Sequence, residues 1–209
     1  MIHPDTELKH VNKDIGHGVF ATKPIPKGTL VYVKDLFEIQ FTPEQFDSLD
    51  HDYKALARKY SYTDENGVRI LSWDHAKYVN HSCDCNTIST GYGFEIAIRD
   101  IAEGEEITDE YSLFNFEHEL GLICHCTNCR KVLRTDDIDT YYTEWDTRIQ
   151  EALQCVRDVE QPLWKFLNSE TKTALMNYLN GHENYLSVLA LKRVEEELPY
   201  LVKMQKRAR

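Results

Sequence analysis

The chain lacks any long apolar run. Within its 209 residues, no apolar segment approaches the roughly 20 residues that a membrane-spanning helix needs. The start of the chain, from Met1 to Asp5, also lacks a basic residue followed by an apolar stretch, so no secretory signal is visible. We therefore expect an intracellular protein, cytoplasmic or nuclear, without membrane contact. Export by a route that needs no such signal stays open.

Positive charge is scarce. The chain has 24 Lys and Arg residues against 35 Asp and Glu residues, which gives a formal net charge of -11. Binding to nucleic acid depends on Lys and Arg side chains that neutralise phosphates, so direct nucleic-acid binding is not expected. An acidic surface attracts a basic partner, such as a peptide rich in Lys and Arg. The same charge also aids solubility, and composition alone does not separate these two interpretations.

Internal repeats and low-complexity tracts are absent, and the length suits one domain with a modest appendage. The first part of the chain predicts short strands, including 31–33, 37–39 and 94–98. Asn66-Gly67 between two runs of β-formers predicts a hairpin. Thr42 and Pro43 predict the cap and first turn of a helix that continues to about Arg58. These signals predict a mainly β fold of several short sheets with some helix.

The character changes near residue 136. Apolar residues recur at helical spacing, as in Tyr141, Trp145 and Ile149. Pro162 is expected to open a second helix that stops at Asn180-Gly181, and a third helix is expected from about Glu183, ended or kinked by Pro199. The chain is therefore divided into residues 1–130, a mainly β domain with a cysteine segment, and residues 131–209, a region of two to four packed helices.

Five of the six cysteines fall in two tight clusters. Three are Cys124, Cys126 and Cys129 within the run Cys-His-Cys-Thr-Asn-Cys. Clustered cysteines without a secretory signal are typical of metal ligands rather than disulfides. Zinc prefers about four tetrahedral nitrogen or sulfur ligands, so this run lacks one. Cys83 is the leading candidate for the fourth ligand, with Cys85 and His125 as competitors.

Three further segments carry candidate site residues. Gly16-His17-Gly18 would let the backbone approach a ligand, because glycine has no Cβ, although close glycines are also common in turns. Residues 77–86, Lys-Tyr-Val-Asn-His-Ser-Cys-Asp-Cys-Asn, pack polar groups that are costly to bury without hydrogen-bond partners. Residues 98–111 predict a strand, a turn with Gly104, a second strand and then Tyr111. Each segment alone is a weak signal.

Together and in this order, the segments resemble the SET-domain family of protein lysine methyltransferases. The resemblance rests on Gly16-His17-Gly18, on 80–83 (Asn-His-Ser-Cys), and on 104–106 (Gly-Glu-Glu) followed by Tyr111. The three later cysteines are similar to the post-SET zinc-binding cluster. The resemblance covers about residues 7–130 and leaves residues 136–209 outside it.

This resemblance implies a SET-domain β-clip core of several short sheets, followed here by the C-terminal helical region. It implies methyl transfer from S-adenosylmethionine to the ε-amine of a lysine in a histone or another basic protein. Tyr111 would be catalytic, and Cys83 would complete a zinc site with Cys124, Cys126 and Cys129. The residues expected to border S-adenosylmethionine are Gly16, His17, Gly18, Lys77, Tyr78, Asn80 and His81.

The chain departs from the family pattern at several positions. Cys85 stands where a proline is usual, and Ser112 stands where glycine is frequent. Asp109 stands two residues before Tyr111, where many relatives carry an aromatic residue that limits how many methyl groups fit. These departures keep a rival hypothesis in view: a catalytically inactive SET-fold module that binds basic peptides or protein partners. Retention of Asn80, His81 and Tyr111 favours the enzyme.

Overall fold

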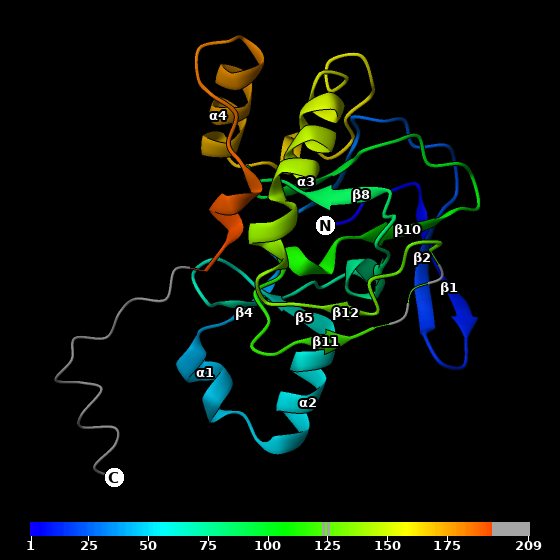
Figure 1. Cartoon of the computed structure of the whole chain (residues 1–209), viewed down its shortest axis with the longest axis vertical. Helices are drawn as coiled ribbons and strands as arrows, with labels where there is room; N and C mark the ends of the chain where they lie inside the picture. The colour runs from blue at the N-terminus through cyan, green and yellow to red at the C-terminus, as the bar shows by residue number, and fades with distance from the viewer. Residues whose placement is uncertain (123, 125, 194–209) are drawn as a thin grey trace, which may run out of the picture.

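The structure is a computed structural model that describes residues 1–122, 124 and 126–193. Short strands lie between two pairs of helices, with α1 and α2 at one end of the molecule and α3 and α4 at the other (Figure 1). The expectation of a mainly β fold of several small sheets with helices is confirmed. The strands are β1 (Thr6–Asn12), β2 (Gly16–Ala21), β3 (Leu30–Val33), β4 (Ile39–Phe41), β5 (Ser61–Thr63), β6 (Arg69–Leu71), β7 (Asn80–His81), β8 (Thr87–Ser89), β9 (Phe94–Ala97), β10 (Glu106–Asp109), β11 (Leu120–Gly121) and β12 (Val132–Leu133).

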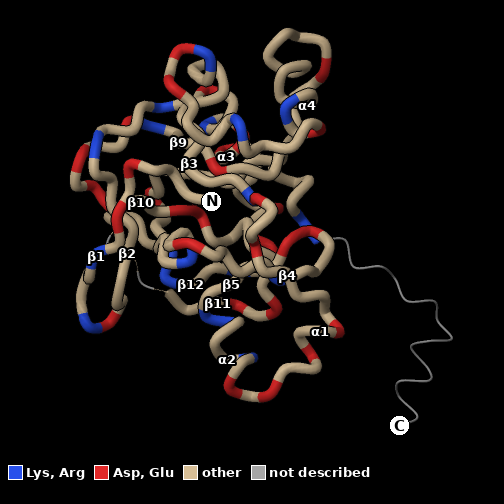
Figure 2. Tube along the Cα trace, turned by 180° about the vertical axis from the view of Figure 1, so that it is seen from behind, with Lys and Arg blue, Asp and Glu red and all other residues tan. Residues whose placement is uncertain are grey.

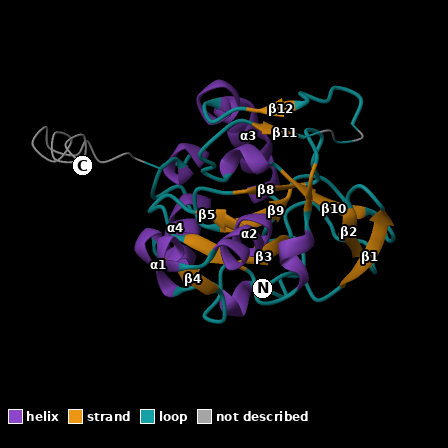
Figure 3. Cartoon of the chain, turned by 90° about the horizontal axis from the view of Figure 1, so that it is seen from below, coloured by secondary structure: helices purple, strands orange, loops and turns teal. Residues whose placement is uncertain are grey.

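Four small sheets form from these strands. The largest has the order β1-β2-β10-β7, two others have the orders β3-β9-β8 and β4-β6-β5, and β11 pairs with β12. The β1–β2 hairpin lies at one edge of the molecule (Figure 3). Strand β10 pairs antiparallel with β2 and parallel with β7. This arrangement brings together three segments that are far apart in the sequence.

The hairpin predicted at Asn66-Gly67 is confirmed. Strands β5 and β6 pair antiparallel around it, and Gly67 has a φ of 76°, a conformation that glycine adopts without steric cost. The Asp64 carboxylate accepts hydrogen bonds from the backbone amides of Asn66 and Val68. The side chain of Asp64 therefore stabilises the turn that contains Asn66-Gly67.

The single helix expected from Pro43 to about Arg58 is in fact two helices. α1 (Pro43–Ser48) begins with the predicted Thr42 cap, which forms a reciprocal capping box with Gln45. α2 (His51–Tyr60) begins at a second cap, because the Asp50 side chain accepts a hydrogen bond from the amide of Tyr53. Two helix starts so close together leave no room for one continuous helix. The strand expected at 37–39 is also displaced and begins at Ile39.

The C-terminal region packs on the same hydrophobic core as the sheets. α3 (Asp137–Leu153) places Trp145 and Ile149 in one buried cluster with Leu30 of β3 and Phe94 of β9. α4 (Ser169–Leu179) and the 3₁₀ turns η3 (Trp164–Phe166) and η4 (Val188–Leu191) complete this region. Burying apolar surface jointly makes the stability of the sheets depend on these helices.

Two expected helix boundaries in this region are wrong. The helix expected from Pro162 starts at Ser169, because the Asn168 side chain caps it by accepting from the amide of Thr171. The helix expected from Glu183 is absent from the described residues of that segment, where only the short turn η4 forms, and Pro199 lies outside the described part. The predicted stop at Asn180-Gly181 is confirmed, since Gly181 has a φ of 73°. Within the described part of the chain, no helix combines the length and the apolar character that crossing a membrane requires.

Candidate active site

The glycine motif and the Asn80 motif meet where β2, β10 and β7 lie side by side. The Asn80 Nδ2 donates to the carbonyl oxygen of His17 at 3.0 Å and to Glu106 Oε1 at 2.7 Å. A Cβ on Gly18 would collide with the Glu106 carboxylate and would lie 3.0 Å from Asn80 Nδ2. Gly18 is therefore required by close packing, whereas Gly16 is required by its φ of 87° at the open start of β2.

Tyr111 follows directly after β10 and begins the 3₁₀ turn η2 (Tyr111–Leu113). Its hydroxyl donates a hydrogen bond of 2.5 Å to the carbonyl oxygen of Val79, the residue before Asn80. Its ring centroid lies 5.5 Å from that of His81. Burial, together with the negative charge of nearby carboxylates, raises the pKa of Tyr111. The phenol therefore stays protonated, with its proton directed at the Val79 carbonyl.

His81 connects the tyrosine to the cysteine cluster. Its Nδ1 accepts from the amide of Tyr111 at 3.3 Å and lies 3.1 Å from the carbonyl oxygen of Asp109. Its Nε2 lies 3.3 Å from the sulfur of Cys83. Burial, aided by the positive charge of Arg130, lowers the pKa of His81 to about 4. The imidazole is therefore neutral at physiological pH. It is buried between the Tyr111 segment and Cys83.

Lys77 and Tyr78 belong to the 3₁₀ turn η1 (His75–Tyr78) beside β2. The Lys77 ammonium donates to the carbonyl oxygen of Asp74 at 2.5 Å. The Tyr78 ring packs between His17 and Tyr60, at centroid distances of 6.0 Å and 5.4 Å. The structure thus places all seven residues expected at the cofactor around the meeting point of β2, β7 and η1.

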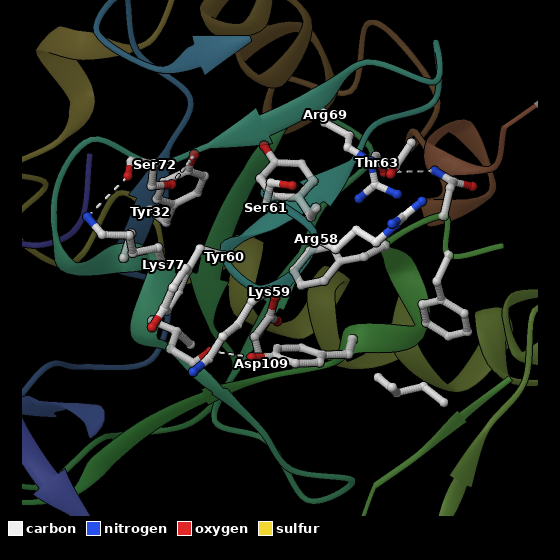
Figure 4. Close-up of a pocket in the computed structure, with 18 of the residues that line it drawn as sticks. Tyr32, Arg58, Lys59, Tyr60, Ser61, Thr63, Arg69, Ser72, Lys77 and Asp109 are labelled. Atoms are coloured by element: carbon white, nitrogen blue, oxygen red, sulfur yellow. Dashed lines mark hydrogen bonds between the residues drawn. The ribbon is translucent and has the colours of Figure 1, made fainter. Parts of the chain in front are cut away.

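A pocket of about 490 Å³ opens beside Tyr111 (Figure 4). Lys77, Val79 and Tyr111 contribute to its wall from the predicted motifs. Most of its other lining side chains come from α2, β5, β6, β9 and the segment after η2. These segments carry no recognisable motif, so their side chains were not predicted from the sequence. These include two basic residues whose guanidinium groups stack on the Phe46 ring, and several aromatic rings: Arg58, Arg69, Tyr60, Tyr62 and Phe114.

Besides the exposed Glu117, two buried carboxyl groups lie in this pocket wall. Asp109 on β10 is 1% exposed, and Glu95 on β9 is 9% exposed. Burial, aided by the charge of Glu110, raises the pKa of Asp109 to about 7, although backbone and Ser89 hydrogen bonds oppose this shift. Burial raises the pKa of Glu95 well above its usual range, and the charge of Asp109 adds to the effect.

The cysteine cluster assembles as the sequence predicts. The sulfur atoms of Cys83, Cys124, Cys126 and Cys129 all lie within 4.8 Å of one another, and those of Cys83 and Cys124 are 3.8 Å apart. Sulfurs bound tetrahedrally to zinc at about 2.3 Å lie roughly 3.8 Å apart. The Cys83–Cys124 pair matches this spacing, whereas the Cys124 and Cys126 sulfurs are closer, at 3.0 Å. The number and type of these thiol ligands fit zinc. The competitor Cys85 is fully buried in the hydrophobic core, and His125 lies outside the described residues.

Arg130 connects this cluster to the tyrosine segment, a role that no sequence motif predicts. Its amide donates to the sulfur of Cys83 at 3.4 Å. Its Nη2 donates to both carboxylate oxygens of Glu110 at 2.6 Å, and its Nη1 donates to Asp137 at 3.1 Å. Because Glu110 immediately precedes Tyr111, one guanidinium joins the cysteines, the tyrosine and the start of α3.

Comparison with known proteins agrees with this geometry. A putative histone-lysine N-methyltransferase, ASHH4 of Arabidopsis thaliana, is 25% identical over 171 residues, which cover 75% of this chain and 47% of the relative. A variant-silencing SET domain-containing protein of Plasmodium falciparum is 32% identical over 143 residues, or 60% of this chain and 5% of the relative. Histone-lysine N-methyltransferase 2D of Homo sapiens is 30% identical over 131 residues, or 56% of this chain and 2% of the relative.

The chain thus spans less than half the length of each of these relatives. The model of the SET domain matches residues 16–112, which run from the first glycine of β2 to the residue after Tyr111. The matched range therefore contains the glycine pair, the Asn80 motif and the tyrosine that the structure brings together. Residues 16–112 of this chain therefore match the SET domain.

Proposed function

We propose that this chain transfers a methyl group from S-adenosylmethionine to the ε-amine of a protein lysine. The observation that carries the proposal is the convergence of β2, β7 and β10, which places the Tyr111 hydroxyl against the Val79 carbonyl in the pocket wall. The names of two of the relatives, a putative histone-lysine N-methyltransferase of a plant and a histone-lysine N-methyltransferase of a human, support the same reaction class.

The residues around the glycine pair fit a cofactor that lies against backbone. Gly18 is packed too tightly for any side chain, and Asn80 is held by two hydrogen bonds from its amide nitrogen. We assign Gly16, His17 and Gly18 to the methionine part of S-adenosylmethionine, and we assign Lys77, Tyr78, Asn80 and His81 to the remainder. When bound, S-adenosylmethionine supplies a methyl group on a positively charged sulfur.

The pocket then has to present a neutral amine, although free lysine titrates near 10.4. Its aromatic walls, including Tyr62 and Phe114 with ring centroids 5.0 Å apart, disfavour the charged form. Tyr111 directs its proton to Val79, so its oxygen lone pairs are available to orient the amine or a polarised methyl group. Positioning of this kind supplies much of the rate enhancement of a displacement.

We further propose that Cys83, Cys124, Cys126 and Cys129 hold one zinc ion. The ion would fix the segment after η2 against β7, which carries His81 two residues before Cys83. In this proposal residues 1–130 form the SET domain with its post-SET segment, and residues 131–209 form the C-terminal helical region that completes the core.

The proposed substrate is a basic segment of a histone or another Lys-rich protein in the nucleus or cytoplasm. Acidic residues outnumber basic ones, and they lie along most parts of the chain trace (Figure 2). Long-range attraction would therefore concentrate a basic peptide near the pocket. Such a peptide can add as an extended strand beside a short sheet edge.

The test is a transfer assay with radiolabelled S-adenosylmethionine and mixed core histones, followed by mass spectrometry of the labelled protein. The proposal expects label on a lysine side chain, with wild-type protein and not with Tyr111→Phe. Binding of S-adenosylmethionine without transfer to the histones or to a whole-cell protein extract would instead support the rival, an inactive SET-fold module that binds basic partners.

A further inference from the structure

The pocket beside Tyr111 contains two buried carboxyl groups that the reaction described above does not use. Asp109 and Glu95 reach it from β10 and β9, which belong to different sheets, and both are at least nine-tenths buried. Ionised groups are costly to bury without a compensating partner. Two buried carboxyl groups in one pocket wall are therefore expected either to bind a positively charged ligand or to be protonated.

Asp109 is poorly satisfied by the rest of the protein. Its Oδ1 has no hydrogen-bond partner among the described residues. Its Oδ2 accepts a long hydrogen bond of 3.5 Å from the Ser89 hydroxyl, and the backbone of Ser89 and Glu110 also interacts with the carboxylate. Among the described residues, two other buried side-chain oxygens also have no hydrogen-bond partner: Thr29 Oγ1 and Glu38 Oε2. Only Asp109 of these three belongs to a residue that lines the pocket.

The basic residues of the pocket do not neutralise this carboxyl. Arg69 pairs with Glu117 at 3.6 Å, and Lys77 donates to backbone carbonyls of 72–74. Arg58 stacks on Phe46. Across the described residues, no ion pair joins any Lys or Arg side chain to Asp109 or Glu95. A cation from outside the chain is therefore the partner that the carboxyls lack.

We propose that Asp109, with Glu95 behind it, binds the ammonium group of the substrate lysine and accepts its proton before methyl transfer. This proposal rests on the proposed function and deepens it. An ammonium offers three N–H donors, and one of them can satisfy Asp109 Oδ1. The aromatic rings of the same wall suit the aliphatic stem and can also attract the cation.

One N–H bond of the ammonium breaks, its electron pair stays on nitrogen, and the proton moves to Asp109 Oδ1, which becomes a neutral acid. The nitrogen electron pair then forms a bond to the methyl group, the methyl–sulfur bond breaks with its electron pair left on sulfur, and the products are a methylammonium ion and a neutral thioether. After the product leaves, the acid returns its proton to water. In a pocket poor in water, a neutral acid beside a neutral amine is favoured over the ion pair more than it is in solution.

The charges around Asp109 suit this role. Burial and the charge of Glu110 raise the pKa of Asp109, while Tyr111 and the deeply buried Cys85 stay neutral because their pKa values are also raised. Glu95 also faces the pocket, and burial raises its pKa. The other basic and acidic residues in the pocket wall are Arg58, Lys59, Arg69, Lys77, His118 and Glu117. A pKa near 7 for Asp109 places it where a proton acceptor works best at physiological pH.

The first test uses the wild-type protein and measures binding alone. The carboxyl carbon of Asp109 is titrated by ¹³C NMR with n-butylammonium and, separately, with neutral n-pentanol. A bound cation favours the carboxylate, so n-butylammonium should lower the pKa of Asp109 whereas n-pentanol should not. An unchanged titration with saturating n-butylammonium would overturn the proposal, whether or not the protein transfers methyl groups.

The second test measures turnover on core histones with Asp109→Asn, which keeps the shape but removes the base. The proposal expects kcat/KM to fall by roughly 10²–10³-fold, and the acidic limb of the pH profile near pH 7 to disappear. The matched control is Asp47→Asn on the exposed face of α1, which should keep both. An Asp109→Asn variant with wild-type turnover and pH profile would overturn proton acceptance. Absence of transfer by the wild type would count against the proposed function, and the NMR result would still decide the ammonium site.

Discussion

Arg130 holds Glu110 through both carboxylate oxygens at 2.6 Å, directly beside Tyr111 in the sequence. The same residue donates its amide to the Cys83 sulfur. The cysteine cluster and the tyrosine are therefore mechanically joined by one guanidinium. Removing one partner of a buried ion pair leaves the other charge uncompensated, so this contact offers a direct test of the connection.

We expect Arg130→Met to destabilise the protein by about 3 kcal/mol, because Glu110 is 2% exposed at its side chain. In a chain of this size that loss corresponds to a fall of roughly 6–12 °C in Tm, measurable by circular dichroism. Turnover should fall more than the folded fraction does. Arg134→Met is the control, since Arg134 pairs with Glu119 on an open surface where both side chains are more than half exposed. Equal effects of the two variants would refute the connection.

Tyr111→Phe should lower kcat by roughly 10²-fold or more, because the ring keeps its packing against His81 but loses the oxygen that orients the reacting groups. Binding of S-adenosylmethionine, measured by calorimetry, should change little. Tyr53→Phe on α2 serves as the control, since Tyr53 is 64% exposed. If Tyr111→Phe turns over as fast as the wild type, Tyr111 has no part in the reaction.

Metal analysis of protein purified without chelator should find about one zinc per chain, since one four-thiol set is present. Cys83→Ala should abolish most of that zinc and lower Tm. Cys155→Ala should retain it, because the Cys155 thiol donates only to a backbone carbonyl of α3. Metal-free wild-type protein with an unchanged Tm would contradict the assignment.

Asp109 should make the stability depend on pH. Its pKa of about 7 in the folded protein exceeds the ordinary value of 3.8, so the folded state binds the proton more tightly than the unfolded state does. Stability is therefore present at low pH and is lost as pH rises from about 4 to about 7. Asp109→Asn should raise Tm at pH 8 by roughly 4–8 °C, for a gain of about 2 kcal/mol. A Tm difference between variant and wild type that is the same at pH 4 and pH 8 would contradict this.

Trp145→Ala should destabilise the whole protein by about 3–5 kcal/mol, because Trp145 is 3% exposed and shares a core with Phe94. Phe166→Ala should cost much less, as Phe166 is 38% exposed. Thermal unfolding followed by both tryptophan fluorescence and far-ultraviolet circular dichroism should give one transition. Two separated transitions would show that the helices unfold independently of the sheets.

The sequence predicted the elements whose signals are local. The Thr42 cap, the Asn66-Gly67 hairpin and the stop at Gly181 each depend on a few adjacent residues, and the structure contains all three. The break between α1 and α2 was missed because the helical pattern continues across Leu49 while Asp50 provides a second cap. Competition between a continuous pattern and a new cap is decided by packing that the sequence does not display.

The candidate site divides in the same way. Gly18, Asn80 and Tyr111 were found because their order along the chain resembles a known family, and β-pairing then brings them together. Arg130, Glu95 and the aromatic residues of the pocket wall were missed. Their partners lie far away in the sequence, so they form no motif with a recognisable spacing. Asp109 was noticed only as a departure, and its unpartnered oxygen became visible only in three dimensions.

The parallel pairing of β7 with β10 has a consequence for how the protein is made. Asn80 and His81 leave the ribosome well before Thr108 and Asp109, with which they align. Closing the long loop between these strands costs conformational entropy before any contact between them forms. Such pairings therefore form late in folding. A nascent chain that has released β2 and β7 but not β10 therefore carries the glycines without the tyrosine, and Tyr111 reaches Val79 only when β10 docks.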